Sequence, residues 1–163
     1  MLINNLLNLS GKTAIVTGAV GIGFGIAYRL AEAGANVVIA SYKVEEVTDS
    51  VGKLTEAGWK AKGVTADVSS EEDVKRVVEE TVQTFGSIDI LVNNAGIYPN
   101  KPLSQMTTAD FEQVINVNLK GVYLCTKYVS DQMIKGGNGG KIINITSIDA
   151  VHPSMIGLNA YDA

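Results

Sequence analysis

The sequence predicts an α/β fold in which helices cover both faces of a doubly wound parallel sheet. Short apolar runs alternate along the chain with longer amphipathic helical patterns, the βαβ order typical of such a sheet. The runs are apolar throughout rather than at every second residue, as expected for strands that are covered on both faces. With 163 residues, 46% of them hydrophobic and 18% charged, the chain is expected to form one globular domain over residues 1–163.

Five strands and four helices are expected in alternation. The expected strands cover residues 13–17, 36–41, 60–68, 88–94 and 141–147. The first helix follows the glycines after the first strand, and the other helices cover residues 44–58, 69–86 and 107–137. The third helix shows a serine cap, an acidic first turn and a terminal glycine, which is a complete helix signature. Right-handed crossovers then give the strand order 3-2-1-4-5.

Composition argues against several classes of function. The net charge is −4 and the lysines and arginines are scattered, so the sequence indicates neither a nucleic-acid surface nor a basic membrane patch. No apolar run approaches the ~18 residues that span a bilayer, and no signal peptide is recognisable. The single cysteine, Cys125, cannot form an internal disulfide, which favours a reducing cytoplasm. No spacing of cysteine, histidine and acidic residues indicates a metal site.

A glycine-rich turn is the first candidate for chemistry. The stretch TGAVGIGFGIA, residues 17–27, places four glycines between the first strand and the first helix. Residues without side chains let the backbone turn tightly and approach a pyrophosphate, to which the helix N-terminus presents free N–H groups and a positive dipole. The alternative is that these glycines serve only the packing of the strand against the helix.

Four further motifs lie at strand ends or within the fourth helix. They are ADVS at 66–69, NNAG at 93–96, NVNLKG at 116–121 and NITS at 144–147. Asparagine is a poor helix former, so its presence at position 118, in the middle of the predicted helix, indicates a specific role for Asn118. The alternative is a solvated or capping asparagine. Asp67 by itself could equally be a helix cap. Tyr161 follows Ser147 by fourteen residues.

Together these motifs resemble the classical short-chain dehydrogenases/reductases over residues 10–163. That family carries T-G-x-x-x-G-x-G where this chain reads T-G-x-x-G-x-G, one residue shorter. The resemblance implies a Rossmann-like fold that binds a nicotinamide dinucleotide. It assigns the phosphate turn to Gly18, Val20, Gly21, Ile22 and Gly23, the adenine border to Asp67 and Val68, and the turn beside the adenine ribose to Asn94, Ala95 and Gly96.

The resemblance also implies three catalytic residues. Asn118 would help to hold a water in a proton relay, Ser147 would orient the substrate oxygen, and Tyr161 would exchange a proton with it. Reduction of a carbonyl needs a hydride donor and a proton donor for the developing alkoxide, and a tyrosine hydroxyl can supply that proton. We therefore expect an NAD(P)(H)-dependent oxidoreductase that interconverts a small carbonyl compound and a secondary alcohol. The alternative is a non-catalytic dinucleotide-binding sensor, which needs neither Ser147 nor Tyr161.

The carboxyl end carries a further expectation. Tyrosine's ordinary pKa near 10 is too high for efficient exchange at neutral pH, so a cation must lower it. In the family that cation is the lysine of Tyr-x-x-x-Lys, which would fall at position 165, beyond residue 163. We therefore expect a Rossmann domain truncated after its fifth strand, inactive by itself, with residues 159–163 too few to nucleate a stable helix. Its exposed fourth helix is expected to favour a homo-oligomer, a dimer or tetramer.

The end of the second strand bears on cofactor choice. A carboxylate there would hold the ribose 2′-OH of NAD, whereas a basic residue accommodates the 2′-phosphate of NADP. Here Ser41 stands in the acidic position and Lys43 follows two residues later. The sequence therefore favours NADP(H), with NAD(H) possible.

Overall fold

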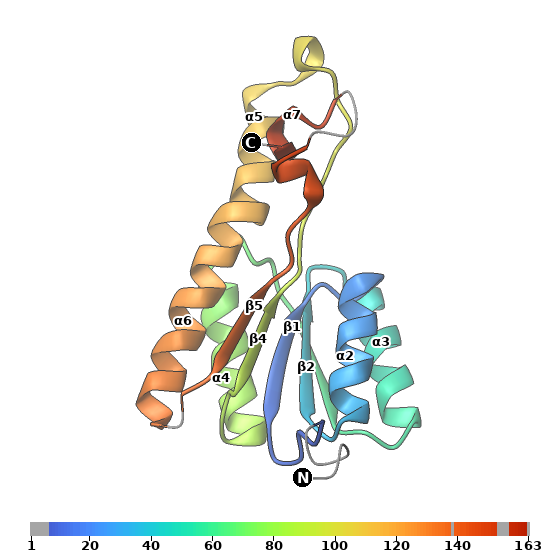
Figure 1. The fold of residues 1–163 in the computed structure, drawn as a ribbon, viewed down its shortest axis with the longest axis vertical. Helices are drawn as coiled ribbons and strands as arrows, with labels where there is room; N and C mark the ends of the chain where they lie inside the picture. Colours follow the sequence, from blue (N-terminus) through green and yellow to red (C-terminus); the bar gives the residue numbers. More distant parts are fainter. Residues whose placement is uncertain (1–6, 138, 153–156, 163) are drawn as a thin grey trace.

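The computed structural model describes residues 7–137, 139–152 and 157–162. A single parallel sheet runs through it in the strand order β3-β2-β1-β4-β5, which confirms the predicted topology (Figure 1). Four parallel pairings hold the sheet together, for example Ile15 opposite Val38 on one side and Leu91 on the other. The strands are β1 Thr13–Thr17, β2 Asn36–Ser41, β3 Ala61–Thr65, β4 Ile90–Asn93 and β5 Lys141–Asn144.

The predicted helices are present, and the fourth one is composite. The α-helices are α2 Ile22–Glu32, α3 Val44–Glu56, α4 Glu71–Phe85, α5 Thr108–Ile115, α6 Gly121–Gly136 and α7 Asn159–Asp162. A π-helical segment, η2 Asn116–Lys120, joins α5 to α6, so that the three form one rod (Figure 1). Two short 3-10 turns complete the described elements, η1 Leu103–Gln105 and η3 Ile148–Ala150.

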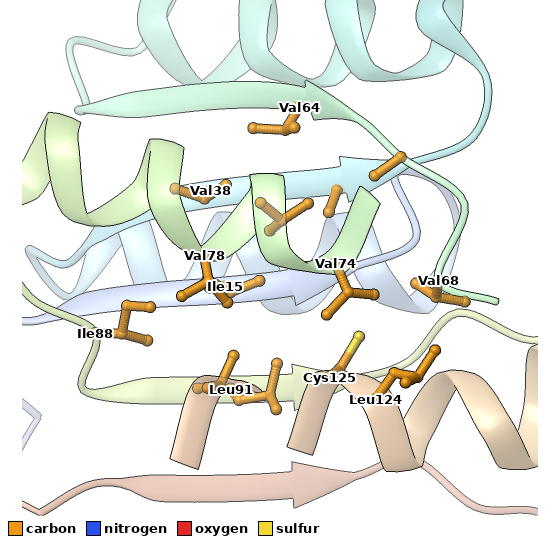
Figure 2. Close-up of a cluster of buried hydrophobic side chains, with 14 of the residues drawn as sticks. Ile15, Val38, Val64, Val68, Val74, Val78, Ile88, Leu91, Leu124 and Cys125 are labelled. Carbon is orange, nitrogen blue, oxygen red and sulfur yellow. The ribbon is translucent and has the colours of Figure 1, made fainter. Parts of the chain in front are cut away.

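Two hydrophobic cores lie on opposite faces of the sheet. In β1, Ile15 packs in the core beneath α4 and α6 (Figure 2). Its neighbours Ala14 and Val16 pack in the core beneath α2 and α3. Successive side chains of a strand point to opposite faces, so a strand covered on both sides must be apolar at every position. This explains why the runs that form β1, β2 and β4 are apolar throughout, whereas β5, at the edge of the sheet, is exposed along its length.

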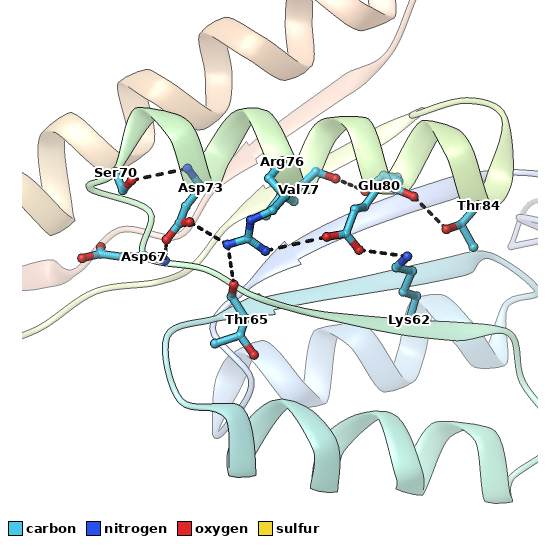
Figure 3. A network of polar contacts seen from close by, with 10 residues as sticks. Lys62, Thr65, Asp67, Ser70, Asp73, Arg76, Val77, Glu80 and Thr84 are labelled. Atoms are coloured by element: carbon cyan, nitrogen blue, oxygen red, sulfur yellow. Dashed lines mark hydrogen bonds and ion pairs between the residues drawn. The ribbon is translucent and has the colours of Figure 1, made fainter.

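A polar network fixes α4 to β3 (Figure 3). Arg76 Nη2 donates to the Thr65 carbonyl at 2.8 Å and to Asp73 Oδ1 at 2.6 Å, and Nη1 lies 3.7 Å from Glu80. Asp73 Oδ2 in turn accepts the Asp67 N–H at 2.9 Å. The Asp67 N–H and the Arg76 guanidinium hold the pKa of Asp73 below its ordinary value. Exposed ion pairs contribute little stability each, so the effect of this network is to hold the loop after β3 in place.

The fifth strand ends earlier than the sequence predicts. Its ladder stops at Asn144, although the Ile145 N–H still donates to the Asn93 carbonyl at 2.9 Å. Ser147, expected to close the strand, instead caps η3, and its hydroxyl accepts the Asp149 N–H at 3.2 Å. A serine side chain that satisfies a nearby backbone donor favours a cap over a strand. Ser147 therefore lies in the loop beyond the strand edge.

The expectation that residues 159–163 form no stable helix is wrong for Asn159–Asp162, which form the single turn α7. The Tyr161 and Asp162 N–H groups donate to the Leu158 carbonyl at 2.7 and 2.9 Å. Leu158 and Ala160 are buried, and α7 packs beside α5 and η3. Tertiary packing thus supplies the stabilisation that an isolated turn lacks.

The rod and α7 extend past the carboxyl ends of β4 and β5 and form a projection above the sheet (Figure 1). The glycine turn and the projection both lie beyond the carboxyl edge of the sheet, which is where doubly wound sheets bind their ligands. In the described part of the chain, no helix is long and apolar enough to cross a membrane.

Candidate functional site

The glycine turn gives α2 an open N-terminus. Gly18 and Gly21 have φ values of 88° and 59°, in the region that favours glycine. No side chain caps α2 and no acidic residue lies in its first turn, whereas α4 and α5 begin with Ser70 and Thr107 caps. The first N–H groups of α2 are therefore available to an anion at the carboxyl edge of the sheet, as a pyrophosphate requires.

Gly23 allows the turn to pack against the NNAG segment. A Cβ at this position would lie 2.2 Å from the Gly18 carbonyl oxygen and 2.5 Å from Asn94 Nδ2. Asn94 Nδ2 donates to the Thr17 carbonyl at 2.8 Å, so its amide fills the space behind the turn. The Nδ2 group of Asn94 thus packs behind the turn and supports it.

Thr17 joins the end of β1 to the end of β4. Its hydroxyl accepts the Asn94 and Ala95 N–H groups at 2.9 and 3.0 Å and donates to the Val92 carbonyl at 3.3 Å. Thr17 is buried, so these bonds replace water for three backbone groups. No role was predicted for Thr17 from the sequence, although its position at the strand end directly before Gly18 is a usable signal.

The end of β2 presents one cation, and that cation is paired. Ser41 is buried, whereas Tyr42 and Lys43 are exposed. Lys43 Nζ donates to Glu46 Oε1 at 2.9 Å and lies 5.4 Å from the Tyr42 ring centroid. The Glu46 carboxylate and the Tyr42 hydroxyl raise the pKa of Lys43. An anionic ligand at Lys43 therefore competes with Glu46.

Asp67 and Val68 lie at the carboxyl edge as expected. The alternative that Asp67 caps α4 is wrong, because Ser70 is the cap and accepts the Asp73 N–H at 3.3 Å. Asp67 is exposed, and its Oδ1 accepts the Ser69 N–H and hydroxyl at 2.9 and 2.8 Å. Val68 is buried against α6, where a Cβ at Gly121 would lie 2.8 Å from Val68 Cγ2.

Asn118 fastens the π-helical segment to the loop after β4. Its Oδ1 accepts the Ile97 N–H at 2.9 Å and its Nδ2 donates to the Ile97 carbonyl at 2.8 Å. The same Oδ1 lies 3.4 Å from where a Cβ on Gly96 would be. The prediction of a continuous helix missed this π-helical turn, in which the Gly121 N–H donates to the Asn116 carbonyl. The mid-helix asparagines were the only sequence signal for it.

Ser147 caps η3 and Tyr161 lies in α7, two neighbouring elements above the same edge. The Ser147 hydroxyl donates to Asp149 Oδ2 at 3.0 Å, so its partner here is Asp149 rather than Tyr161. The half-buried Tyr161 ring meets the edge of Tyr98 at 6.0 Å between centroids, with 60° between the planes. Tyr98 is 69% exposed and follows the NNAG turn by two residues. Neither Asp149 nor Tyr98 was predicted from the sequence.

Comparison with known proteins agrees with this arrangement. The sequence model of the family described as short chain dehydrogenase matches residues 12–163. The chain belongs to this family. Among curated short-chain dehydrogenases, it is 40% identical over 148 residues to 2-dehydro-3-deoxy-D-gluconate 5-dehydrogenase of Dickeya dadantii. The matched region covers 90% of this chain and 58% of that protein. It is 41% identical over 142 residues to galactitol 2-dehydrogenase of Agrobacterium fabrum, which covers 86% of this chain and 54% of that protein.

Solved structures of short-chain dehydrogenases share the fold. A short-chain type dehydrogenase/reductase from Mycobacterium marinum superposes with a TM-score of 0.94 at 30% identity, covering 99% of this chain and 66% of that one. A 7α-hydroxysteroid dehydrogenase in complex with NADH and 7-oxo glycochenodeoxycholic acid gives a TM-score of 0.91 at 34% identity, covering 99% of this chain and 62% of that one. The chain thus spans little more than half the length of the curated relatives named above.

Proposed function

We propose that this chain carries the cofactor site and part of the catalytic site of an NAD(P)(H)-dependent oxidoreductase that interconverts a small carbonyl compound and a secondary alcohol. The supporting observation is the placement of two features at one edge of the sheet. The uncapped N-terminus of α2 fits a pyrophosphate, and Ser147 and Tyr161 stand above the same edge on adjoining elements. The residues that pack behind the turn, Gly23 and Asn94, leave its outer side for the dinucleotide.

The proposed chemistry gives each hydroxyl a distinct part. The nicotinamide, when bound, supplies or accepts the hydride. Tyr161 donates its phenolic proton to the oxygen of the carbonyl as the alkoxide develops, and takes it back in the reverse direction. Ser147 donates a hydrogen bond to the same oxygen, for which it must exchange its present partner Asp149.

Asn118 has a supporting part in the proposed relay. Each polar atom of its side chain makes one bond to Ile97, and the remaining N–H and lone pair of the amide could hold the relay water. The bonds from Asn118 to Ile97 also hold the adjoining residue Tyr98 in place above the cofactor site.

The substitution Tyr161→Phe tests the proposed proton donor. It keeps the ring contact with Tyr98, and it should abolish turnover in the active enzyme and leave cofactor binding unchanged.

We propose NADP(H) as the preferred cofactor, with NAD(H) as the alternative. Ser41 leaves no carboxylate to repel a 2′-phosphate, and Lys43 can exchange Glu46 for that phosphate. The NADH complex of the 7α-hydroxysteroid dehydrogenase supports the alternative. The paired state of Lys43 implies a modest preference, because the phosphate gains one ion pair while Glu46 loses one.

Fluorescence titration of the chain with NADPH and NADH tests the proposal. The Lys43→Ala variant should weaken NADPH binding about five- to tenfold and leave NADH binding unchanged, as expected for one charge-assisted contact. The matched control is Lys53→Ala, which removes a lysine within α3 that is likewise paired with a carboxylate, Asp49 at 2.6 Å. Tighter binding of NADH than of NADPH by the unaltered chain would contradict the preference.

A non-catalytic dinucleotide-binding sensor is the second candidate. The observation that favours it is the Ser147 hydroxyl, which is bound to Asp149 instead of being directed toward Tyr161. An assay of NAD(P)H oxidation with a panel of ketones, on the chain and on any longer form that contains it, separates the two. For the 163 residues alone we propose binding without turnover, since the proton exchange needs a cation beside Tyr161 and, within the described residues, the ring of Tyr161 contacts Tyr98 instead.

We further propose a homo-oligomer, a dimer or tetramer, located in the cytoplasm. Large apolar side chains are exposed along the rod, namely Phe111, Leu119, Tyr123 and Ile134. Such a concentration is typical of an interface. Cys125 is a buried free thiol whose pKa burial raises to about 12, which suits a reducing compartment. Light scattering after gel filtration measures the mass directly.

A further inference from the structure

The buried face of α3 contains one polar residue. Val47, Ser50 and Leu54 recur at helical spacing and all face inward. Ser50 is 2% exposed, as deeply buried as its apolar neighbours. Burying a hydroxyl costs free energy unless the group is hydrogen-bonded, so the partner of the Ser50 hydroxyl indicates the role of this residue.

That partner is the glycine turn. Ser50 Oγ donates to the carbonyl oxygen of Ala19 at 2.6 Å, across 31 positions in the sequence. Ala19 is itself buried and stands between Gly18 and Gly21. The bond therefore reaches from the inner face of α3 to the middle of the turn that precedes α2.

The geometry points to Ser50 as a positioning residue for cofactor binding, a role that rests on the proposed function. Gly18 and Gly21 give the turn more conformational freedom than any other residue type would. On one side the turn is tied to β2 through the Gly18 N–H, which donates to the Ala40 carbonyl at 2.8 Å. Ser50 ties the next residue to α3, so the turn is held in one shape before the ligand arrives.

A turn that is already ordered loses less entropy when it binds a ligand. Ser50 therefore raises affinity without touching the cofactor, because it limits the conformations open to the free protein. The turn is also one residue shorter than the T-G-x-x-x-G-x-G pattern, so the two anchors, at Gly18 and Ala19, restrain a large part of it.

The variant Ser50→Ala tests this role with two measurements. Hydrogen exchange of the ligand-free chain should accelerate at residues 18–23 and stay unchanged in β1. The Kd for NADPH or NADH, whichever binds more tightly, should rise about three- to tenfold, the size expected for one neutral hydrogen bond.

The control is Thr81→Ala. Thr81 is 0% exposed, and its hydroxyl donates at 2.6 Å to the Val77 carbonyl within α4, far from the turn in sequence. This variant also loses a buried hydroxyl and should melt earlier, yet keep both the exchange at residues 18–23 and the Kd. If Ser50→Ala does not fold, Ser50→Cys replaces it. The thiol is a weaker donor than the hydroxyl but still donates, so the rise in Kd should be smaller than for alanine.

The outcomes separate this role from the proposed function. An unaltered chain that binds neither cofactor overturns the proposed function, and the role of Ser50 with it. If the unaltered chain binds while the Ser50 variant matches it in Kd and in exchange at residues 18–23, only the role of Ser50 is overturned. The same holds if Thr81→Ala raises the Kd as much as Ser50→Ala does.

Discussion

The substitution Gly23→Ala should weaken cofactor binding by moving the glycine turn. Its Cβ would lie 2.2 Å from the Gly18 carbonyl oxygen, where real Cβ atoms stay beyond 3.0 Å, so the gap must open by about 0.8 Å, the difference of the two. Asn94 Nδ2, at 2.5 Å, cannot give way easily because it donates to the Thr17 carbonyl. Overpacking of this kind costs about 1–3 kcal/mol, which corresponds to an affinity loss of about 5- to 150-fold if binding must restore the original turn.

Gly25→Ala provides the matched control two residues later. A Cβ at Gly25 meets nothing within 4 Å, and its φ is in the ordinary helical range. Alanine in place of a helical glycine should stabilise the chain by about 0.5–1 kcal/mol, so the two variants should shift Tm in opposite directions.

Calorimetry and fluorescence titration with NADPH and NADH measure both effects. Gly23→Ala should lower Tm by about 2–4 °C for each kcal/mol lost. Equal cofactor affinities for Gly23→Ala and Gly25→Ala would refute the reasoning, since they would show that the packing of the turn on Asn94 does not shape the binding site. An unchanged Tm for Gly23→Ala would likewise show that the turn yields without strain.

Three further outcomes follow from single contacts. Asn118→Ala should cost about 1–3 kcal/mol, because the N–H and carbonyl of Ile97 lose their partner, and hydrogen exchange should accelerate at residue 97. Ser70→Ala should cost about 1 kcal/mol in thermal unfolding, because α4 loses its cap. Asp73 has a lowered pKa, so its stabilising contribution is complete above its ordinary value of 3.8 and disappears as the pH falls through the folded value; Asp73→Asn should therefore differ from the unaltered chain at pH 6 and converge with it in acid.

Each outcome has a contrary result. Asn116→Ala removes an exposed asparagine from the same π-helical segment, and an equal loss there would attribute the Asn118 effect to helix propensity rather than to Ile97. An unchanged Tm for Ser70→Ala would mean that Asp73 and Arg76 hold the start of α4 without the cap. A constant difference between Asp73→Asn and the unaltered chain from pH 6 to acid would exclude titration of this carboxyl as the cause.

The strand order and the turn could be read from the sequence because they depend on local patterns. Continuous apolar runs, a glycine turn after the first strand and right-handed crossovers leave one arrangement, and the ladder from Ile15 to Val38 and Leu91 follows it. The start of α4 at Ser70 could be predicted for the same reason, since the capping serine and the acidic first turn are adjacent in sequence.

Contacts between distant segments lay beyond the sequence. Nothing near Asn118 indicates that its amide pairs with Ile97, 21 residues away, and nothing near Ser50 indicates Ala19. The length of β5 was overestimated because Ile145 continues the apolar run, although the ladder has ended at Asn144. The turn α7 was missed because its stability comes from packing against α5, which no local propensity encodes.

The projection above the sheet has an evolutionary consequence. Below the carboxyl edge, β1, β2 and β4 are almost entirely buried, so most substitutions in these strands endanger folding itself. Above it, Tyr98, Leu103, Ile148 and Val151 are largely exposed and carry few packing obligations. Mutational drift can therefore change the upper part with less effect on folding than changes in the lower part would have, a modularity that lets one scaffold carry different sites. A combinatorial library confined to residues 97–106 and 148–152 should accordingly retain a high proportion of folded, dinucleotide-competent members.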